Sequence, residues 1–310
     1  MMKVADSDIT FVIQGPIQRK DDRSKRENIT QTSIKNIRNL FPESTIIVST
    51  WKGQNTDNID CDTLLLLEDP GPNFVFNGKD KQQLNNNRQI YSTHQGLLHV
   101  KTPYAVKLRS DTVLIGREFV DCYEQFSDET RKESWSYLTR RVLTTSTFFI
   151  CSHYGRTIHF HKSDIFDFGL TEDLLKIWPE ELIPELTFSL PKAYKARYPA
   201  TEQFLFLHWF GLLTQQSLHI NSKTEDDAGL GAVFWPQFIA NNLLVDKPEN
   251  LGIDITERFY KRGNLALEYD LDDWKAFNEI ARHPLNKKLI SRRFKEWKGK
   301  VIQKLFSTFI

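Results

Sequence analysis

Four short runs of apolar and β-branched residues mark the first 115 positions of the chain, and polar turn residues close most of them. The runs cover residues 9–13, 45–49, 64–67 and 104–108. Between them, apolar residues recur at helical spacing after Asn28 and from about residue 82 to residue 100. Strands that alternate with helices and consist of continuous apolar residues are typical of a parallel sheet covered on both faces. The pattern therefore predicts an α/β fold.

The pattern between residues 116 and 245 is less regular. Short runs at 135–138, 148–151 and 157–161 are predicted to be strands. Thr171 and Thr201 precede apolar helical stretches, and their hydroxyls favour the start of a helix. These features, with a helical pattern in the tail, predict a mixed, mostly parallel sheet flanked by helices and a C-terminal helical extension.

Three polar turns follow predicted strands and supply candidate chemistry. They are Gln14-Gly15-Pro16, residues 68–71 and Arg109-Ser110-Asp111. The carboxyl ends of parallel strands meet at one edge of a sheet, which is where ligands bind in open α/β folds. A glycine in such a turn lets the backbone approach a ligand closely. Each turn alone reads as an ordinary turn, but together they predict a nucleotide site.

Four residues have specific expected roles at this edge. A hard carboxylate such as Asp111 is the ligand that a phosphate-bound Mg²⁺ or Mn²⁺ prefers. Asp69 can accept hydrogen bonds from a base or a ribose, while Asn87 and Arg88 lie near a helix start from which Arg88 can pair with phosphate. The ordinary alternatives are a turn residue for Asp111 and a solvated salt-bridge partner for Arg88. Neither a Walker A loop nor a GxGxxG motif follows the first strand, so scattered loop contacts would have to hold the nucleotide.

Composition restricts the functional classes further. The chain has 310 residues, of which 40% are hydrophobic and 26% charged, as is typical of a globular protein with a large core. Its net charge of +1 argues against a nucleic-acid polycation. The three cysteines form no CxxC spacing, the N-terminus resembles no signal peptide, and no apolar stretch approaches the roughly 20 residues that span a bilayer. We therefore expect a cytoplasmic protein without a nucleic-acid partner.

The segment 286–310 is basic and amphipathic. Eight lysines and arginines and a single acid, Glu296, give it a net charge of +7. Its apolar residues recur at helical spacing, and they are Leu289, Ile290, Phe294, Trp297, Val301, Ile302, Leu305 and Phe306. This pattern predicts an interfacial helix that binds the anionic inner face of the cytoplasmic membrane. The alternative is a helix packed on the domain with a solvated basic face.

Several runs of the sequence, taken in order, resemble one protein family. They are TFVIQGPI (10–17), NITQTSIKNIRNLFPESTIIVSTW (28–51), NNRQIYSTHQGL (86–97), KLRSDTVL (107–114) and HFHKSDIFDFGLTEDL (159–174). Over residues 8–240 the chain resembles the WavE lipopolysaccharide synthesis family, whose members look like GT-A-type glycosyltransferases. The resemblance implies a GT-A-like domain at 1–245, with a nucleotide-binding half at 1–115 and an acceptor half at 116–245, followed by an extension at 246–310. It also implies a nucleotide-sugar donor and a lipid-linked or lipid A-linked glycan acceptor.

The same resemblance implies a divalent metal ion, which GT-A enzymes hold through an Asp-x-Asp motif. The matching run in this chain is Arg109-Ser110-Asp111, which keeps only the last carboxylate. Either that carboxylate suffices together with diphosphate and water, or Arg109 or Arg88 neutralises the leaving diphosphate instead. His219, late in the fold, is the residue that would complete a metal or diphosphate shell.

An inverting transferase also needs a base for the acceptor hydroxyl. Glu202 is the first candidate, because folds of this kind place an acidic acceptor-side residue at a helix start, and Asp164 is the second. The alternative for both is a carboxylate that merely favours the start of a helix. His159 and His161 are two apart in a predicted strand and would face the same side.

Two classes of function remain open on the sequence. The first is a glycosyltransferase that moves a sugar to a lipopolysaccharide, capsule or other surface glycan. The second is a non-catalytic nucleotide- or glycan-binding partner in a membrane-associated polysaccharide assembly complex, which the missing first aspartate keeps open. A nucleotidyltransferase is disfavoured, because no glycine-rich, lysine-bearing phosphate loop follows the first strand.

Overall fold

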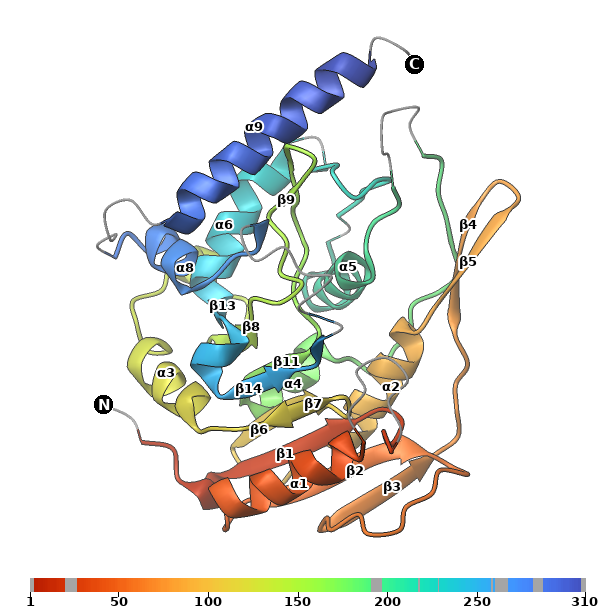
Figure 1. The fold of residues 1–310 in the computed structure, drawn as a ribbon, viewed down its shortest axis with the longest axis vertical. Helices are drawn as coiled ribbons and strands as arrows, with labels where there is room; N and C mark the ends of the chain where they lie inside the picture. Colours follow the sequence, from red (N-terminus) through yellow and green to blue (C-terminus); the bar gives the residue numbers. More distant parts are fainter. Residues whose placement is uncertain are drawn as a thin grey trace.

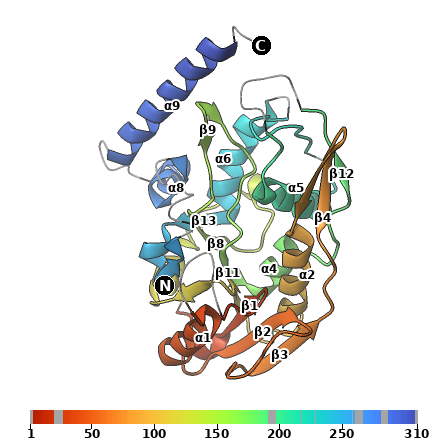
Figure 2. The ribbon, with the colours of Figure 1, turned by 45° about the vertical axis from the view of Figure 1, so that its right-hand side comes forward.

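The computed structural model describes residues 3–19, 27–190, 197–216, 218–227, 229–257, 259, 267–280 and 287–307. Its centre is a seven-stranded sheet in the order β13-β8-β11-β6-β1-β2-β3 (Figure 1). The strands of this sheet are β1 (Ile9–Gln14), β2 (Thr45–Trp51), β3 (Thr63–Leu67), β6 (Tyr104–Arg109), β8 (Val142–Thr145), β11 (Phe166–Leu170) and β13 (Leu243–Asp246). Helices flank the sheet (Figure 2). The predicted fold class, a mixed and mostly parallel sheet flanked by helices with a C-terminal helix, is confirmed.

Helices and shorter strands cover and extend the sheet. The helices are α1 (Ile29–Leu40), α2 (Asn86–Leu97), α3 (Glu118–Phe126), α4 (Thr171–Ile177), α5 (Thr201–Thr214), α6 (Leu230–Asn242), α8 (Leu271–Phe277) and α9 (Lys287–Ser307), with 3₁₀ turns η1 (Asp6–Asp8), η2 (Glu133–Trp135) and η3 (Pro248–Leu251). Three small sheets join β12 (Leu186–Thr187), β4 (Asn73–Asn77) and β5 (Asp80–Leu84), then β14 (Ile253–Ile255) and β7 (Thr112–Leu114), then β10 (Arg156–Thr157) and β9 (Ser152–His153).

The strand directions place the candidate turns along one edge. β3, β2, β1 and β6 run parallel, and Gln14 is in register with both Ser49 and Arg109. β11 is antiparallel to both β6 and β8, while β13 is parallel to β8. The carboxyl ends of β1, β3 and β6 therefore share an edge, as the sequence predicts.

Alternation along β1 distributes the helices over the two faces of the sheet. Phe11 packs against Phe41, which ends α1, and against Phe119 of α3. The next residue, Val12, points to the opposite face and meets α2. A Cβ atom on Gly96 of α2 would lie 2.3 Å from Val12 Cγ1, so this close approach requires glycine.

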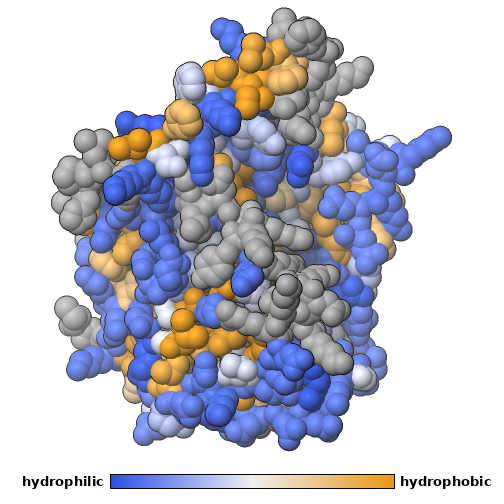
Figure 3. All heavy atoms as spheres, viewed as in Figure 1, coloured by the Kyte–Doolittle hydropathy of each residue, from blue (hydrophilic) through white to orange (hydrophobic). Residues whose placement is uncertain are grey.

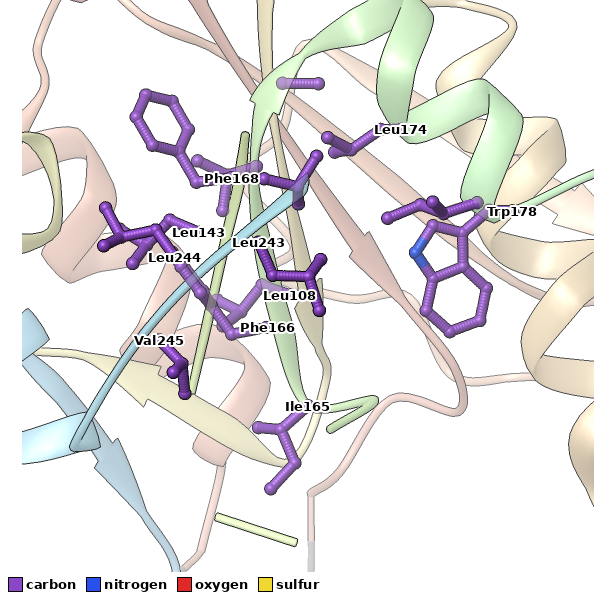
Figure 4. Close-up of a cluster of buried hydrophobic side chains, with 14 of the residues drawn as sticks. Leu108, Leu143, Ile165, Phe166, Phe168, Leu174, Trp178, Leu243, Leu244 and Val245 are labelled. Carbon is purple, nitrogen blue, oxygen red and sulfur yellow. The ribbon is translucent and has the colours of Figure 1, made fainter. Parts of the chain in front are cut away.

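One continuous hydrophobic core contains side chains from the first 115 residues and from the rest of the chain. Close to the centre, side chains of β6, β8, β11 and β13 pack together (Figure 4), and Leu108, Leu143, Phe166 and Leu243 have no exposed surface. Trp178 follows α4, and its indole N–H donates a hydrogen bond to a buried carboxylate of β11. This core fixes the strand ends relative to α4 and α5, which carry the site.

Three of the predicted strands are wrong. Apart from Thr157 in β10 and a single bridge at Ile150, residues 135–138, 148–151 and 157–161 do not form strands. Phe148 and Phe160 have φ angles of 60° and 62°, which interrupts the alternation that a strand requires. The predicted helix at 82–100 is also shorter than expected, because β5 pairs with β4 before α2 begins.

Candidate active site

The turns after β1 and β6 are joined by hydrogen bonds. The Ser110 amide donates to the Gln14 carbonyl oxygen (3.0 Å), and the Ser110 hydroxyl donates to the Pro16 carbonyl oxygen (2.7 Å). Gly15 has a φ of +110°, and a Cβ atom there would meet Ser110 Oγ at 3.1 Å. Glycine is therefore required, because this conformation is strained for other residues. The structure brings these predicted residues together and uses Ser110 to hold the turn.

Two predicted nucleotide contacts have structural partners within the protein. The buried side chain of Gln14 accepts a hydrogen bond through Oε1 from Ser92 of α2 (2.9 Å). Asn87 Oδ1 accepts from the Ile183 amide (2.9 Å), and Asn87 Nδ2 donates to the Ile183 carbonyl oxygen (3.0 Å). Both side chains hold α2 in place, a role that the sequence pattern did not indicate.

Asp69 and Arg88 face each other at the carboxyl end of β3. Arg88 donates from Nε and Nη2 to the Asp69 carboxylate at 2.6–3.0 Å in a bidentate pair. The pair is partly exposed, and the hydrogen bonds from Arg88 hold the pKa of Asp69 below its ordinary value. Arg88 and Asp69 are each other's partners, so a phosphate that binds Arg88 or a ribose that binds Asp69 would have to compete with this ion pair.

Arg109 occupies the centre of the site between two carboxylates. Its Nε and Nη2 donate to the two oxygens of Asp111 at 3.0 and 2.9 Å, and its Nη1 lies 3.5 Å from Asp164 Oδ2. Burial opposes the charge of Arg109, but the two carboxylates outweigh burial and hold its pKa above the ordinary value. Asp164 reaches this point because it lies just before β11, the antiparallel neighbour of β6. It does not open a helix.

The residues at this edge do not fit the predicted metal ion. Both carboxylate oxygens of Asp111 already accept hydrogen bonds from the cationic Arg109. His219 lies on an exposed loop, where its backbone amide donates to Asp227. In the described ranges of the chain, no group of three histidine, cysteine, aspartate or glutamate side chains could hold a metal. No step proposed below depends on a metal ion.

Nucleoside diphosphate affinity is expected to be the same, within about twofold, in excess EDTA and in Mn²⁺, because Arg109 supplies the positive charge beside Asp111. Calorimetric titrations with UDP and GDP under the two conditions measure this. A rise in affinity of more than about tenfold with Mn²⁺ would contradict the expectation and make Asp111 a metal ligand.

Asp164 and Glu202 line the same pocket. The recess is small, and the aromatic residues Trp178, Phe206 and Trp209 also line it. Glu202 lies in the first turn of α5, and its side chain is 15% exposed. Aromatic walls with a few converging polar groups are typical of ligand pockets.

The two carboxylates of this pocket are driven toward opposite protonation states. Burial raises the pKa of Glu202 to about 7, and the negative charge of Asp164 adds to the effect. Burial alone would also raise the pKa of Asp164, but the charges of Arg109 and Lys107 outweigh burial and hold that pKa below its ordinary value. A pair of acids whose pKa values are pushed apart is characteristic of acid–base catalysis.

A histidine and a lysine also lie near Glu202. His161 Nε2 lies 3.7 Å from Glu202 Oε2. Burial lowers the pKa of His161 well below its usual value, so its ring is neutral at pH 7. The half-buried Lys223 lowers the pKa of Glu202 through its charge, although less strongly than burial raises it.

Hydrogen bonds from α2 and α5 fix the relative positions of these groups. Gln203 is fully buried, and its Nε2 donates to the carbonyl oxygens of His159 (2.8 Å) and Lys223 (3.1 Å). From α2, Asn86 donates to the Thr201 carbonyl oxygen (2.9 Å), and Gln89 similarly binds the carbonyl of Asp164. The start of α5 is therefore tied to both sides of the pocket.

Lys107 is a site residue that the sequence reading missed. It is fully buried, donates to the Asp164 carbonyl oxygen and lies 4.4 Å from the centre of the Trp178 ring. Burial lowers its pKa to about 7, although Asp164 opposes this effect. A lysine inside the apolar run 104–108 was the available signal, because a strand buried on both faces rarely carries a charge.

The fold and the carboxylate pair define a mixed α/β protein with an enzyme-like acid–base pocket. A family model described as WavE lipopolysaccharide synthesis matches residues 9–307, and the chain belongs to this family. Among solved structures, a cytidylyltransferase from Leptospira borgpetersenii is similar at 10% identity and a TM-score of 0.33, covering 59% of this chain and 76% of that one. No curated protein sequence matches the chain.

Proposed function

We propose that this protein transfers a sugar from a nucleotide-sugar donor to a lipopolysaccharide or related surface-glycan acceptor. The observation that carries the proposal is the pair Asp164 and Glu202, which share a pocket but have pKa values shifted in opposite directions. A general base that acts near neutral pH needs a pKa of about 7, and Glu202 combines that pKa with a place in the pocket beside Asp164. Membership of a lipopolysaccharide synthesis family supports the glycan acceptor.

The proposed reaction is a direct displacement. The acceptor hydroxyl oxygen attacks the anomeric carbon of the donor sugar, and the bond from that carbon to the diphosphate oxygen breaks. The nucleoside diphosphate leaves with the bonding electrons, and Arg109 stabilises its negative charge. Deprotonated Glu202 takes the proton of the attacking hydroxyl. Asp111 and Asp164 hold the Arg109 guanidinium in position.

Incubation with a panel of nucleotide sugars tests the proposal directly. At least one donor is expected to be hydrolysed slowly in the absence of acceptor, with release of the nucleoside diphosphate. Calorimetry with the same nucleotides accompanies the assay. A protein that binds a nucleotide but hydrolyses and transfers none of the sugars would be the non-catalytic partner instead.

Asp111→Ala is expected to lower turnover by about ten- to a hundredfold, because Arg109 loses the carboxylate that orients its guanidinium. Steady-state kinetics with the donor identified above measure the change. Asp121→Ala, which removes an exposed carboxylate from α3, is the matched control and is expected to retain normal turnover. Near-normal turnover of Asp111→Ala would remove Asp111 from the mechanism.

We propose further that α9 lies on an anionic membrane surface, as the basic amphipathic pattern predicted. The support comes from the orientation of the helix, because its inward face is polar. Arg292 donates to the Asp273 carboxylate at 2.6 and 2.8 Å, and Lys288 forms an ion pair with Asp270. A Cβ atom on Gly299 would lie 2.4 Å from backbone atoms of the β9–β10 turn, so the helix rests directly on that hairpin.

The apolar residues of α9 are consequently on its outer side. Ile290, Phe294, Trp297, Val301 and Leu305 are 38–61% exposed and follow one another at intervals of three or four residues. Figure 3 shows hydrophobic residues gathered over this end of the molecule. Exposed basic residues accompany the apolar stripe, and they include Arg293, Lys298 and Lys300. None of the helices in the described chain is long and apolar enough to cross a membrane.

A further inference from the structure

A second recess, separate from the pocket of Asp164 and Trp178, lies beneath α9. It is small and is lined by residues of the β9–β10 hairpin, α9 and the segments around residues 197 and 223. The side chains used in the argument are those of His153, Arg156, Arg197, Lys223 and Gln303. The hairpin and α9 lie side by side (Figures 1 and 2).

The recess concentrates positive charge without an acid among its lining residues. Three cationic side chains line it, and none of the ion pairs between described residues involves Arg156, Arg197 or Lys223. Arg156 instead donates from Nε to Gln303 Oε1 (2.9 Å), and its two terminal nitrogens form no hydrogen bond with the described residues. Three cations around one recess repel one another, so an anion bound among them would be strongly attracted.

The pKa of His153 is lowered by burial and by the same three cationic side chains. Burial lowers its pKa to about 4, and the charges of Lys223, Arg197 and Arg156 add to this effect. Its Nε2 is buried and has no hydrogen-bond partner within the described part of the chain. A buried polar atom without a partner is uncommon and points to a missing ligand or water molecule. The neutral ring can donate to an anion when its proton lies on Nε2.

We propose that this basic recess binds a phosphate group of the acceptor, as a phosphate monoester or a terminal diphosphate carried by a lipid headgroup. The inference rests on the proposed sugar transfer and names a part of its acceptor. Guanidinium groups match phosphate oxygens in pairs, and Arg156 and Arg197 supply two of them. Gln303 belongs to α9, so the recess lies next to the helix that is proposed to contact the membrane.

Lys223 connects the recess to Glu202, the proposed base. It lines the recess, and its charge also acts on Glu202 at the start of α5. A phosphate held here would therefore place the attached acceptor glycan close to the proposed base. Donor diphosphate shares the same chemistry but is expected near Arg109 and the strand edge.

Vesicle binding by the full chain distinguishes an acceptor phosphate on a lipid headgroup from the donor diphosphate. Wild-type protein is expected to bind vesicles with 20% phosphatidic acid, a monoester, at least about fivefold more tightly than vesicles with 20% phosphatidylglycerol, a diester. The double variant Arg156→Gln with Arg197→Gln is expected to lose this preference and keep its binding to phosphatidylglycerol. The control, Arg293→Gln with Lys298→Gln on the exposed side of α9, is expected to weaken binding to both vesicles and keep the preference. Arg197→Gln alone repeats the test in case the double variant does not fold.

The remaining outcomes overturn the proposal. If the recess variant and the α9 control lose the same share of binding to both lipids, the recess contributes only general charge. If the recess variant loses affinity for UDP as strongly as it loses the monoester preference, the phosphate belongs to the donor. None of these measurements requires sugar transfer, so a protein without transferase activity can still show the preference, and an active one can lack it.

Discussion

Glu202→Gln is expected to lower the turnover number for sugar transfer at least about a hundredfold while changing nucleotide affinity by less than about threefold. Glutamine keeps the size of the side chain and removes only its ability to take the proton of the acceptor hydroxyl. The nucleotide is expected to contact the strand edge and Arg109, so its affinity does not depend on this group. Steady-state kinetics and calorimetry on the same preparations separate the two effects.

The pH dependence of the wild-type enzyme follows from the same group. A base acts only when it is deprotonated, and burial together with Asp164 raises the pKa of Glu202 to about 7. Turnover is therefore expected to rise as pH increases through about 7 and to level off above it. The residual activity of Glu202→Gln is expected to lack this step. His161 is neutral throughout this range, and Asp164 is ionised, so neither produces the transition. Burial lowers the pKa of Lys107 to about 7 as well, so the loss of the step in Glu202→Gln is what assigns it to Glu202.

Stability provides an independent measurement of the same pKa. The folded protein holds a proton on Glu202 up to pH 7, whereas an unfolded chain releases it near the ordinary value of 4.5. The folded state is therefore progressively destabilised as pH rises from about 4.5 to 7, by about 3 kcal/mol at most. Glu202→Gln abolishes this loss. Its free energy of unfolding, measured with urea, is expected to exceed that of the wild type at pH 8 and to match it at pH 4.

Glu268→Gln is the matched control for these experiments. Glu268 is also buried, and burial raises its pKa to about 7, but it binds the Phe148 amide outside the pocket. Its substitution is expected to leave turnover and the pH profile unchanged. Equal losses of turnover in the two variants would mean that a buried carboxyl group matters only for folding, and would contradict the assignment of Glu202.

The first half of the fold was predictable because its central strands, β1 and β2, are buried on both faces. Residues 9–13 and 45–49 consist almost entirely of apolar and β-branched side chains, and they form β1 and β2. In the second half, β8 contains two buried threonines and β11 contains a buried aspartate, Asp167, so neither stands out as an apolar run. The missed strands are those whose polar side chains find buried partners, as Asp167 does with Lys162.

Some residues of the candidate site could be identified from the sequence, but Lys107 was missed and the pairings could not be predicted. The sequence identified Arg109, Asp111, Asp164 and Glu202, yet the separation of the last two along the chain gave no indication that they share a pocket. Arg109 was considered as a replacement for the metal, but its bidentate contact with Asp111 depends on side-chain geometry at the end of β6. Pairing of this kind arises from tertiary packing, which residue spacing does not report.

The orientation of α9 on the domain also could not be predicted from the sequence. Helical periodicity showed that apolar and basic residues alternate in the tail, but it could not tell which side contacts the domain. The ion pairs of Lys288 and Arg292 with Asp270 and Asp273 turn the polar side inward. A helix packed by its charged side, with Phe294 exposed, has the character of an interfacial helix.

Phe294→Glu with Trp297→Glu is expected to lower the partition coefficient onto anionic vesicles at least about a hundredfold. Each side chain is 61% exposed, and burying one large apolar side chain contributes about 1.5–3 kcal/mol. The two new carboxylates also oppose the anionic lipid. Co-sedimentation with phosphatidylglycerol vesicles measures the loss, and binding of the wild type is expected to weaken as salt is raised, because the basic residues of α9 contribute electrostatically.

The matched control for this variant is Leu98→Glu with Ile115→Glu. These two residues are 56% and 54% exposed and lie away from α9, so the control introduces the same charge and removes similar apolar surface. It is expected to bind vesicles nearly as well as the wild type. If both double variants lose binding equally, charge alone determines association and α9 is not the binding element. If the wild type does not bind anionic vesicles, the exposed stripe of α9 does not serve as a membrane anchor.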